Sequence, residues 1–347
     1  SHKQSNDQSS HAVREAMLPF LGPNHGNPSS IHGTGRDAKE AVDTARRQVA
    51  KTINARPRSI VFTGGGSEAD NLAIKGVAFA QREHGNHIIT TTIEHPAVLG
   101  ACGFLEKIGF EVTYLDVDET GWLAPEKLHK AMTSKTILVS IMLANNEVGT
   151  ILPIRELATI AHEHGTLFHT DAVQAAGKIK VDVEELGVDL LSLSGHKFHA
   201  PKGIGALYVK KGVELEPLIH GGKQESGLRA GTENVAAIVG FGKAAELALQ
   251  ASQNGEKMAA LRYELESGIK ELIPEAKLNG HSEHRLPNTL NLTLPDLRGE
   301  SLVVALDQHG ISLSSGSACK SGSPKPTHVL MAMGKSEEDA HCAVRLS

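Results

Sequence analysis

Short apolar runs alternate with amphipathic stretches through the first two thirds of the chain. The runs predict strands at residues 59–63, 87–93, 110–116, 136–143, 167–170 and 188–193. The stretches between them predict helices at 37–53, 67–81, 97–108, 124–132 and 154–164. This alternation is typical of a mostly parallel mixed sheet with helices on both faces. We therefore expect an α/β fold.

The pattern changes after Gly231. Two long helices are predicted at 234–250 and 256–272, followed by a half-exposed strand at 288–294, a helix at 300–308 and a short strand at 311–313. This order indicates a smaller α+β domain. Because residues 1–11 are polar and lack periodicity, we interpret them as a disordered or tag-like arm. The expected large domain is 12–244, and the small C-terminal domain is 245–347.

Composition narrows the class of protein. A net charge of -5 and an aromatic content of 3% argue against nucleic-acid binding. The 347-residue chain contains no run of eighteen apolar residues, so we expect no membrane span. Cys102, Cys319 and Cys342 are too few and too irregularly spaced for a disulfide framework or a zinc site, and a reducing cytoplasm is the expected setting. The 19 histidines form no metal-binding spacing, so no metal is expected.

The sequence Gly64-Gly65-Gly66-Ser67 joins a predicted strand to a predicted helix. Glycines allow a ligand to approach the backbone closely, and a helix N-terminus offers free N–H groups to an anion. Ser67 could cap the helix or bind a phosphate oxygen. No Gly-Lys-Ser/Thr follows, so the turn is not a P-loop. A phosphate site and a plain capped turn fit this sequence about equally well.

Further polar groups follow other predicted strands. His95 could stack on a flat cofactor, shuttle protons or cap a turn. Asn146, in the pair of adjacent asparagines, suits ligand contact or turn formation. Asp171 would need a positive partner if buried, and a protonated pyridine nitrogen is such a partner. Its simpler interpretation is a helix N-cap.

Lys197 ends the sequence Ser194-Gly195-His196-Lys197, after the strand at 188–193. Open α/β sheets place their chemistry at such strand ends. A lysine amine titrates near ~10.4 and forms a Schiff base only when deprotonated, so a catalytic lysine needs a nearby cation or a desolvated pocket. Alone, this sequence would suggest a surface lysine. Together, the strand-end groups match the chemistry of pyridoxal 5′-phosphate (PLP): a phosphate cup, a ring stacker, an acid for the ring nitrogen and a Schiff-base lysine.

These motifs resemble those of the cysteine desulfurases of the NifS/IscS family, in the class V aminotransferase group of PLP-dependent transferases with fold type I. The resemblance extends from about residue 12 to the end of the chain. The matching segments are 26–32, 64–71, 94–96, 144–149, 169–174, 194–197, 229–234 and 314–319.

The resemblance implies a role for each matching residue. Lys197 bonds the cofactor and moves protons, Asp171 pairs with the ring nitrogen, and His95 stacks on the ring. The other implied cofactor-binding residues are Gly66, Ser67, Asn146, Gln174, Ser194, His196 and, reaching in from the partner subunit, Thr232. Substrate binding is implied for Asn146, Arg345 and His32. A guanidinium suits a substrate carboxylate because its fork pairs with both oxygens.

Cys319 separates this family from its relatives. It lies between glycines and serines, where we expect a mobile, exposed loop. A thiolate there could attack the substrate sulfur and leave as a persulfide. We interpret Cys102 and Cys342 as structural.

The implied function is a PLP-dependent cysteine desulfurase that converts L-cysteine to L-alanine and transfers the sulfur to Cys319. The implied partners are a second copy of the chain, in a homodimer, and sulfur-acceptor proteins such as an iron–sulfur cluster scaffold. Three alternatives stay open: a selenocysteine lyase, a class V aminotransferase, and a catalytically impaired scaffold that only binds assembly partners.

Overall fold

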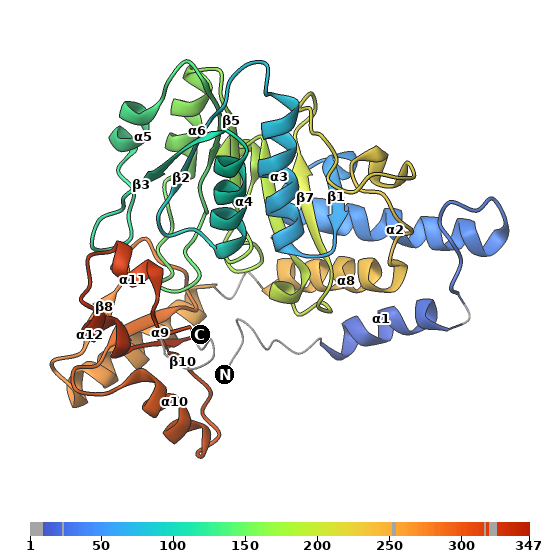
Figure 1. Cartoon of the computed structure of the whole chain (residues 1–347). Coiled ribbons are helices and arrows are strands. Elements are labelled where there is room, and N and C mark those ends of the chain that lie inside the picture. The colour runs from blue at the N-terminus through green and yellow to red at the C-terminus, as the bar shows by residue number, and fades with distance from the viewer. Residues whose placement is uncertain (1–9, 23, 252–254, 316, 319–324) are drawn as a thin grey trace.

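The computed structural model describes residues 10–22, 24–251, 255–315, 317–318 and 325–347 (Figure 1). A large α/β part holds a seven-stranded sheet, and a smaller part with its own sheet lies beside it. The α/β class and the smaller α+β part agree with the expectation from the sequence.

The large sheet has the strand order β1-β7-β6-β5-β4-β2-β3. Its strands are β1 (Ile60–Thr63), β2 (His87–Thr91), β3 (Glu111–Leu115), β4 (Thr136–Ser140), β5 (Leu167–Asp171), β6 (Leu190–Ser194) and β7 (Gly205–Val209). β7 runs antiparallel to both β1 and β6, whereas the pairs from β6 to β3 are parallel. The mixed, mostly parallel sheet is therefore confirmed, although β7 was not predicted.

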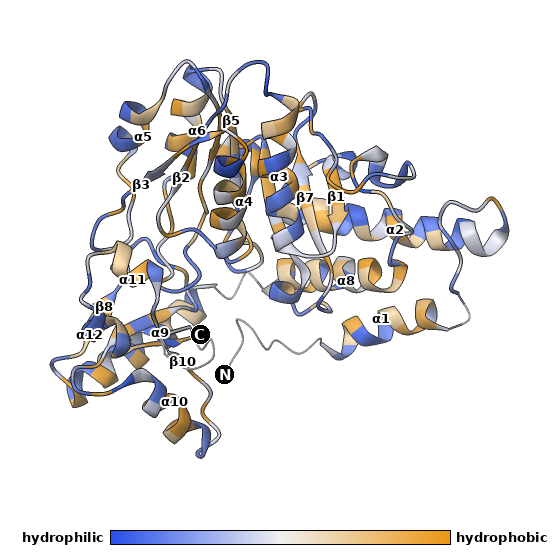
Figure 2. Ribbon diagram, in the orientation of Figure 1, coloured by the Kyte–Doolittle hydropathy of each residue, from blue (hydrophilic) through white to orange (hydrophobic). Residues whose placement is uncertain are grey.

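Helices cover both faces of this sheet, as expected. The main helices are α2 (Gly33–Thr52), α3 (Gly66–Ala80), α4 (Pro96–Lys107), α5 (Pro125–Ala131), α6 (Ile154–Glu163), α7 (Val183–Leu186) and α8 (Val235–Ala251). Neighbouring strand residues point to opposite faces, so Ile88 packs in the core with α3 and α4 while Ile89 packs in the core with α2, α6 and α8. Figure 2 shows this concentration of hydrophobic residues along the strands.

The N-terminal region differs from the expectation. Ser10 caps helix α1 (His11–Leu21) by accepting a hydrogen bond from the Val13 N–H. The last two residues of the expected arm are therefore the N-cap and the first residue of a helix. Residues 1–9 lie outside the described residues. α2 begins at Gly33 rather than at residue 37, and the end of α2 nearest α1 projects from the body of the molecule (Figure 1).

The smaller part is built on an antiparallel sheet with the order β10-β13-β9-β8. Its elements are α9 (Gly255–Leu272), β8 (Lys277–Asn279), β9 (Leu290–Thr293), α10 (Gly299–Asp307), β10 (Ser314–Ser315), β11 (Ser317–Ala318), β12 (Lys325–Pro326), α11 (His328–Ala332), α12 (Glu337–His341) and β13 (Ala343–Leu346). The strand predicted at 311–313 was wrong: Leu313 is buried in the core of this part, but pairing begins at Ser314.

The expected domain boundary between residues 244 and 245 falls inside α8. This helix continues to Ala251 and packs along α1 and α2, so the chain passes to the smaller part only after it. In the part of the chain that the structure describes, no single helix is long and apolar enough to cross a membrane, although α8 and α9 pass that test as a bent pair.

Candidate active site

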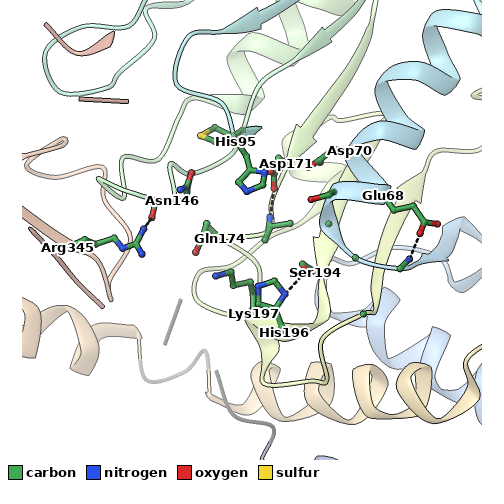
Figure 3. A pocket seen from close by; sticks show the side chains of 18 residues that line it. Glu68, Asp70, His95, Asn146, Asp171, Gln174, Ser194, His196, Lys197 and Arg345 are labelled. Carbon is green, nitrogen blue, oxygen red and sulfur yellow. Dashed lines mark hydrogen bonds between the residues drawn. The ribbon is translucent and has the colours of Figure 1, made fainter. Parts of the chain in front are cut away.

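A cavity of about 540 Å³ lies at the strand ends of the large sheet, where the smaller part faces it. It is lined by many of the residues predicted from the sequence: Gly66, Ser67, His95, Asn146, Asp171, Gln174, Ser194, His196, Lys197 and Arg345. Figure 3 shows their side chains around this space. Parallel strands bring their carboxyl ends to one edge of a sheet, and this explains how residues far apart in the sequence meet here.

Three predicted residues are not placed at this cavity. His32 caps α2, where its Nδ1 accepts a hydrogen bond from the Gly35 N–H, and it is exposed. Thr232 is also exposed and is not part of the cavity lining. Cys319 lies outside the described residues. The other two cysteines are buried, and burial raises the pKa of the Cys102 thiol to about 12, as expected for structural residues.

The glycine turn between β1 and α3 is a backbone site for an anion. Gly65 has φ +152°, which favours glycine, and α3 begins at Gly66. A Cβ atom added to Gly66 would lie 3.0 Å from Val173 and 3.2 Å from Ser194, so a larger residue would fit here only if these neighbours moved. Of the two possibilities for Ser67, the structure excludes the cap, because the N-cap is Gly65. The free N–H groups of the first turn of α3 therefore face the cavity without a side-chain acceptor from the cap.

Polar side chains complete this end of the cavity. The Ser194 hydroxyl lies 2.9 Å from His196 Nδ1, at the start of a short 3₁₀ helix (Gly195–Phe198) that follows β6. Burial, followed by the charge of Lys197, lowers the pKa of His196 to about 4. His196 is therefore a neutral hydrogen-bonding group at pH 7 rather than a cation.

The central groups are Lys197, Asp171 and His95. Asp171 ends β5, beside β6, and its Oδ1 accepts a hydrogen bond of 2.9 Å from the Val173 N–H. Burial raises the pKa of Asp171, while the backbone N–H, His95 and Lys197 counteract this rise. His95 caps α4, and its Nδ1 accepts from the Ala97 N–H over 3.2 Å. This bond leaves Nε2 to carry the proton of the neutral ring.

Arg345 reaches the opposite side of the cavity from β13. Its Nη1 donates to the Asn146 carbonyl oxygen over 3.0 Å (Figure 3). Its Nη2 donates to the Ser314 hydroxyl over 3.1 Å. Its buried Nε has no partner among the described residues. Burial lowers the pKa of this guanidinium. A buried guanidinium with an unused donor suits a carboxylate ligand.

Sequence reasoning missed the acid Asp70, which also lines the cavity. It lies on the buried face of α3, among Ala69, Leu72 and Ala73, and its Oδ1 is 3.8 Å from His169 Nε2. Burial, followed by the charge of Asp171, raises the pKa of Asp70 well above its usual value. An acid among the apolar positions of a helix was the available signal, since such a position rarely carries a charge without a functional or structural reason.

Glu94, next to His95, is a second buried acid. Its Oε1 accepts hydrogen bonds from the Thr91 hydroxyl over 2.8 Å and from the Met142 N–H over 3.0 Å. Burial raises the pKa of Glu94 to about 8. This carboxyl group is therefore mostly protonated at pH 7.

The fold and the site together define a PLP-dependent enzyme of fold type I. The cofactor fits the residues present. A glycine turn at a helix N-terminus and the hydroxyl of Ser194 can receive its phosphate, Asp171 can pair with its ring nitrogen, and the Lys197 amine can bond its aldehyde.

Comparison with known proteins gives the family. Residues 4–347 match the model of the aminotransferase class-V family. The chain belongs to this family, whose cofactor is PLP, and it is similar over nearly all of its length to cysteine desulfurases of the IscS and NifS type.

Two relatives show the extent of the similarity. "Cysteine desulfurase IscS" from Dictyoglomus turgidum is 53% identical over 336 residues, which cover 96% of this chain and 85% of the relative. The protein of the same name from Methanosarcina thermophila is 52% identical, with 96% and 83% covered.

Solved structures agree with this result. A structure described as a NifS-like protein superposes with a TM-score of 0.93 at 42% identity, covering 99% of this chain and 92% of its own. A structure described as SspA in complex with cysteine has a TM-score of 0.85 at 39% identity, with 99% and 97% covered.

Proposed function

We propose that this protein is an L-cysteine desulfurase that releases L-alanine and transfers the sulfur to Cys319. The observation that carries this proposal is the meeting of Lys197, Asp171 and Arg345 at one cavity, in a chain 53% identical to a cysteine desulfurase. In the reaction, the Cys319 thiolate attacks the substrate sulfur. The carbon–sulfur bond breaks, its electron pair returns to carbon, and carbon takes up a proton. Cys319 then carries a persulfide.

Each residue of the site has a proposed task. PLP, when bound, accepts electron density from the substrate carbon atoms. Lys197 supplies the amine that bonds the cofactor and moves the proton at the substrate Cα, and the carboxylate of Asp171 keeps the ring nitrogen protonated. His95 stacks on the ring and takes part in the acid/base steps. Arg345 binds the substrate carboxylate.

The wider role is proposed on the names of the relatives. "IscS" proteins from several organisms share about half of their residues with this chain, and this supports a role in iron–sulfur cluster assembly and other sulfur transfer. The protein would act in the cytoplasm on acceptor proteins. We further propose a homodimer, in which the exposed Thr232 completes the partner's phosphate site. Sedimentation of the purified protein checks this, and a fully active monomer would contradict it.

The first experiment is the visible absorption spectrum before and after addition of L-cysteine. A yellow band that changes with L-cysteine and is missing in Lys197→Ala supports the proposal. Alanine and sulfide are measured in the same samples. Cys319→Ala should keep the spectral change but lose sulfur transfer to an acceptor. A class V aminotransferase would instead keep full activity in Cys319→Ala with an oxo-acid, and turnover of L-selenocysteine far above that of L-cysteine would favour a selenocysteine lyase.

A further inference from the structure

A carboxylate stands beside the proposed phosphate site. Glu68 is the third residue of α3, lines the cavity, and accepts a hydrogen bond of 2.8 Å from the Gly64 N–H (Figure 3). An acidic side chain stabilises a helix N-terminus because it interacts with the same N–H groups and dipole that attract an anion. An uncompensated charge on Glu68 would therefore oppose the binding of a phosphate at this turn.

Arg229 compensates this charge. Its Nε lies 2.9 Å from Glu68 Oε1, and its Nη2 lies 3.5 Å from Glu68 Oε2. The two side chains are 27% and 26% exposed, so water screens the pair only in part. Glu68 lies directly against the turn, since a Cβ atom added to Gly64 would come within 2.7 Å of Glu68 Oε2.

The segment that carries Arg229 is anchored independently of any ligand. Glu225, four residues earlier, accepts the Phe62 N–H over 2.8 Å and two hydrogen bonds of 2.6 and 2.7 Å from the Arg46 guanidinium. Arg46 also donates to the Ile60 carbonyl over 2.6 Å. β1 is an edge strand, so these side chains bond its free edge just before the glycine turn. Arg229 is thereby held at a fixed place relative to the turn.

We propose that Arg229 is a positioning residue of the phosphate site, which neutralises Glu68 and holds it against the Gly64 N–H. The inference rests on the proposed placement of the cofactor phosphate at this turn. Loss of Arg229 leaves a negative Glu68 free beside the phosphate, so the harm comes from Glu68 rather than from a missing contact. Removal of the Glu68 charge should then restore binding.

The test compares Arg229→Gln, Glu68→Gln and the double variant with the wild-type chain. Lys243→Gln is the matched control, since it breaks an ion pair of 2.7 Å with Glu246 away from the cavity. Dissociation constants are measured by absorption titration for PLP and for pyridoxal, which lacks the phosphate. Arg229→Gln should weaken PLP binding roughly tenfold or more and leave pyridoxal binding within about twofold. The double variant and the control should bind PLP within about threefold of the wild type.

Two results would overturn the proposal. Equal weakening for PLP and pyridoxal would mean that Arg229 supports the site as a whole, and a double variant as weak as Arg229→Gln would mean that Arg229 itself binds the phosphate. If the wild-type chain bound neither compound, the proposed function would fail instead. Equilibrium dialysis of inorganic phosphate with the same proteins would then decide the role of Arg229, with the same order of affinities expected.

Discussion

The role of Arg345 leads to a prediction about substrate affinity. Arg345→Lys keeps the positive charge but loses the planar fork that pairs with both carboxylate oxygens. In the structure, one Nη holds the Asn146 carbonyl, the other holds Ser314, and the buried Nε has no partner among the described residues. A hydrogen bond to a charged group contributes about 1.5–3 kcal/mol. Loss of one such bond to the substrate should raise the KM for L-cysteine about 10- to 150-fold.

The assay is alanine formation as a function of L-cysteine concentration. If Arg345 binds the ground state and the transition state equally, KM rises while kcat changes little. Cysteamine, which lacks the carboxylate, is the control substrate, and its turnover, where measurable, should not respond to the substitution. An unchanged KM for L-cysteine would refute the reasoning. An equal loss for both compounds, together with a lower melting temperature, would show that Arg345 only joins the two parts of the chain.

Three further substitutions test the buried groups by urea unfolding. The pKa of Glu94 is raised from 4.5 to about 8, so between these pH values the folded state holds one proton more than the unfolded state. The free energy of unfolding should therefore fall by about 1.4 kcal/mol per pH unit as pH rises. Glu94→Gln should remove this pH dependence, and a difference from wild type that does not change with pH would contradict the reasoning. Glu225→Gln leaves the Arg46 charge without its carboxylate and should lower the free energy of unfolding by about 3–5 kcal/mol. The exposed control Glu246→Gln should lower it by less than about 1 kcal/mol. Gly66→Ala places a Cβ atom 3.0 Å from its nearest neighbour, so it should lower the free energy of unfolding by about 1–3 kcal/mol and weaken PLP binding. An unchanged free energy of unfolding would show that the turn can relax.

Much of the site could be predicted because strand ends carry a local signal. Asp171 and Lys197 each follow an apolar run, and parallel strands place such ends along one edge. The rule needs only the strands and their direction, not the details of packing. Arg345 differs from these strand-end residues: it enters the cavity from the antiparallel sheet of the smaller part, and the resemblance to a family, rather than a local pattern, indicated it.

The contacts that hold these groups in place could not be predicted. Glu68 and Arg229 are 161 residues apart in the sequence, and Arg46 and Glu225 are 179 apart. Nothing local marks such a pair, because each member alone looks like an ordinary surface charge. The antiparallel strand β7 was missed although residues 204–209 form a short apolar run; what could not be predicted is its antiparallel pairing with both β1 and β6.

Three buried acids at or near the cavity differ in how strongly their surroundings favour the ionised form. Asp70, Glu94 and Asp171 are all buried, and burial raises the pKa of each. Only for Asp171 do both His95 and Lys197 oppose the rise in pKa. The charge of Asp171, in contrast, raises the pKa of Asp70 and of Glu94. A cationic ring nitrogen beside Asp171 would favour its ionised form and thereby strengthen proton binding by Asp70 and Glu94. Negative charge among these acids would then be favoured on Asp171, at the position where the ring nitrogen is proposed to bind. Because a second charge in this low-dielectric region would need a partner of its own, the raised pKa values of Asp70 and Glu94 would help to keep the ring nitrogen of PLP paired with the carboxylate of Asp171 alone.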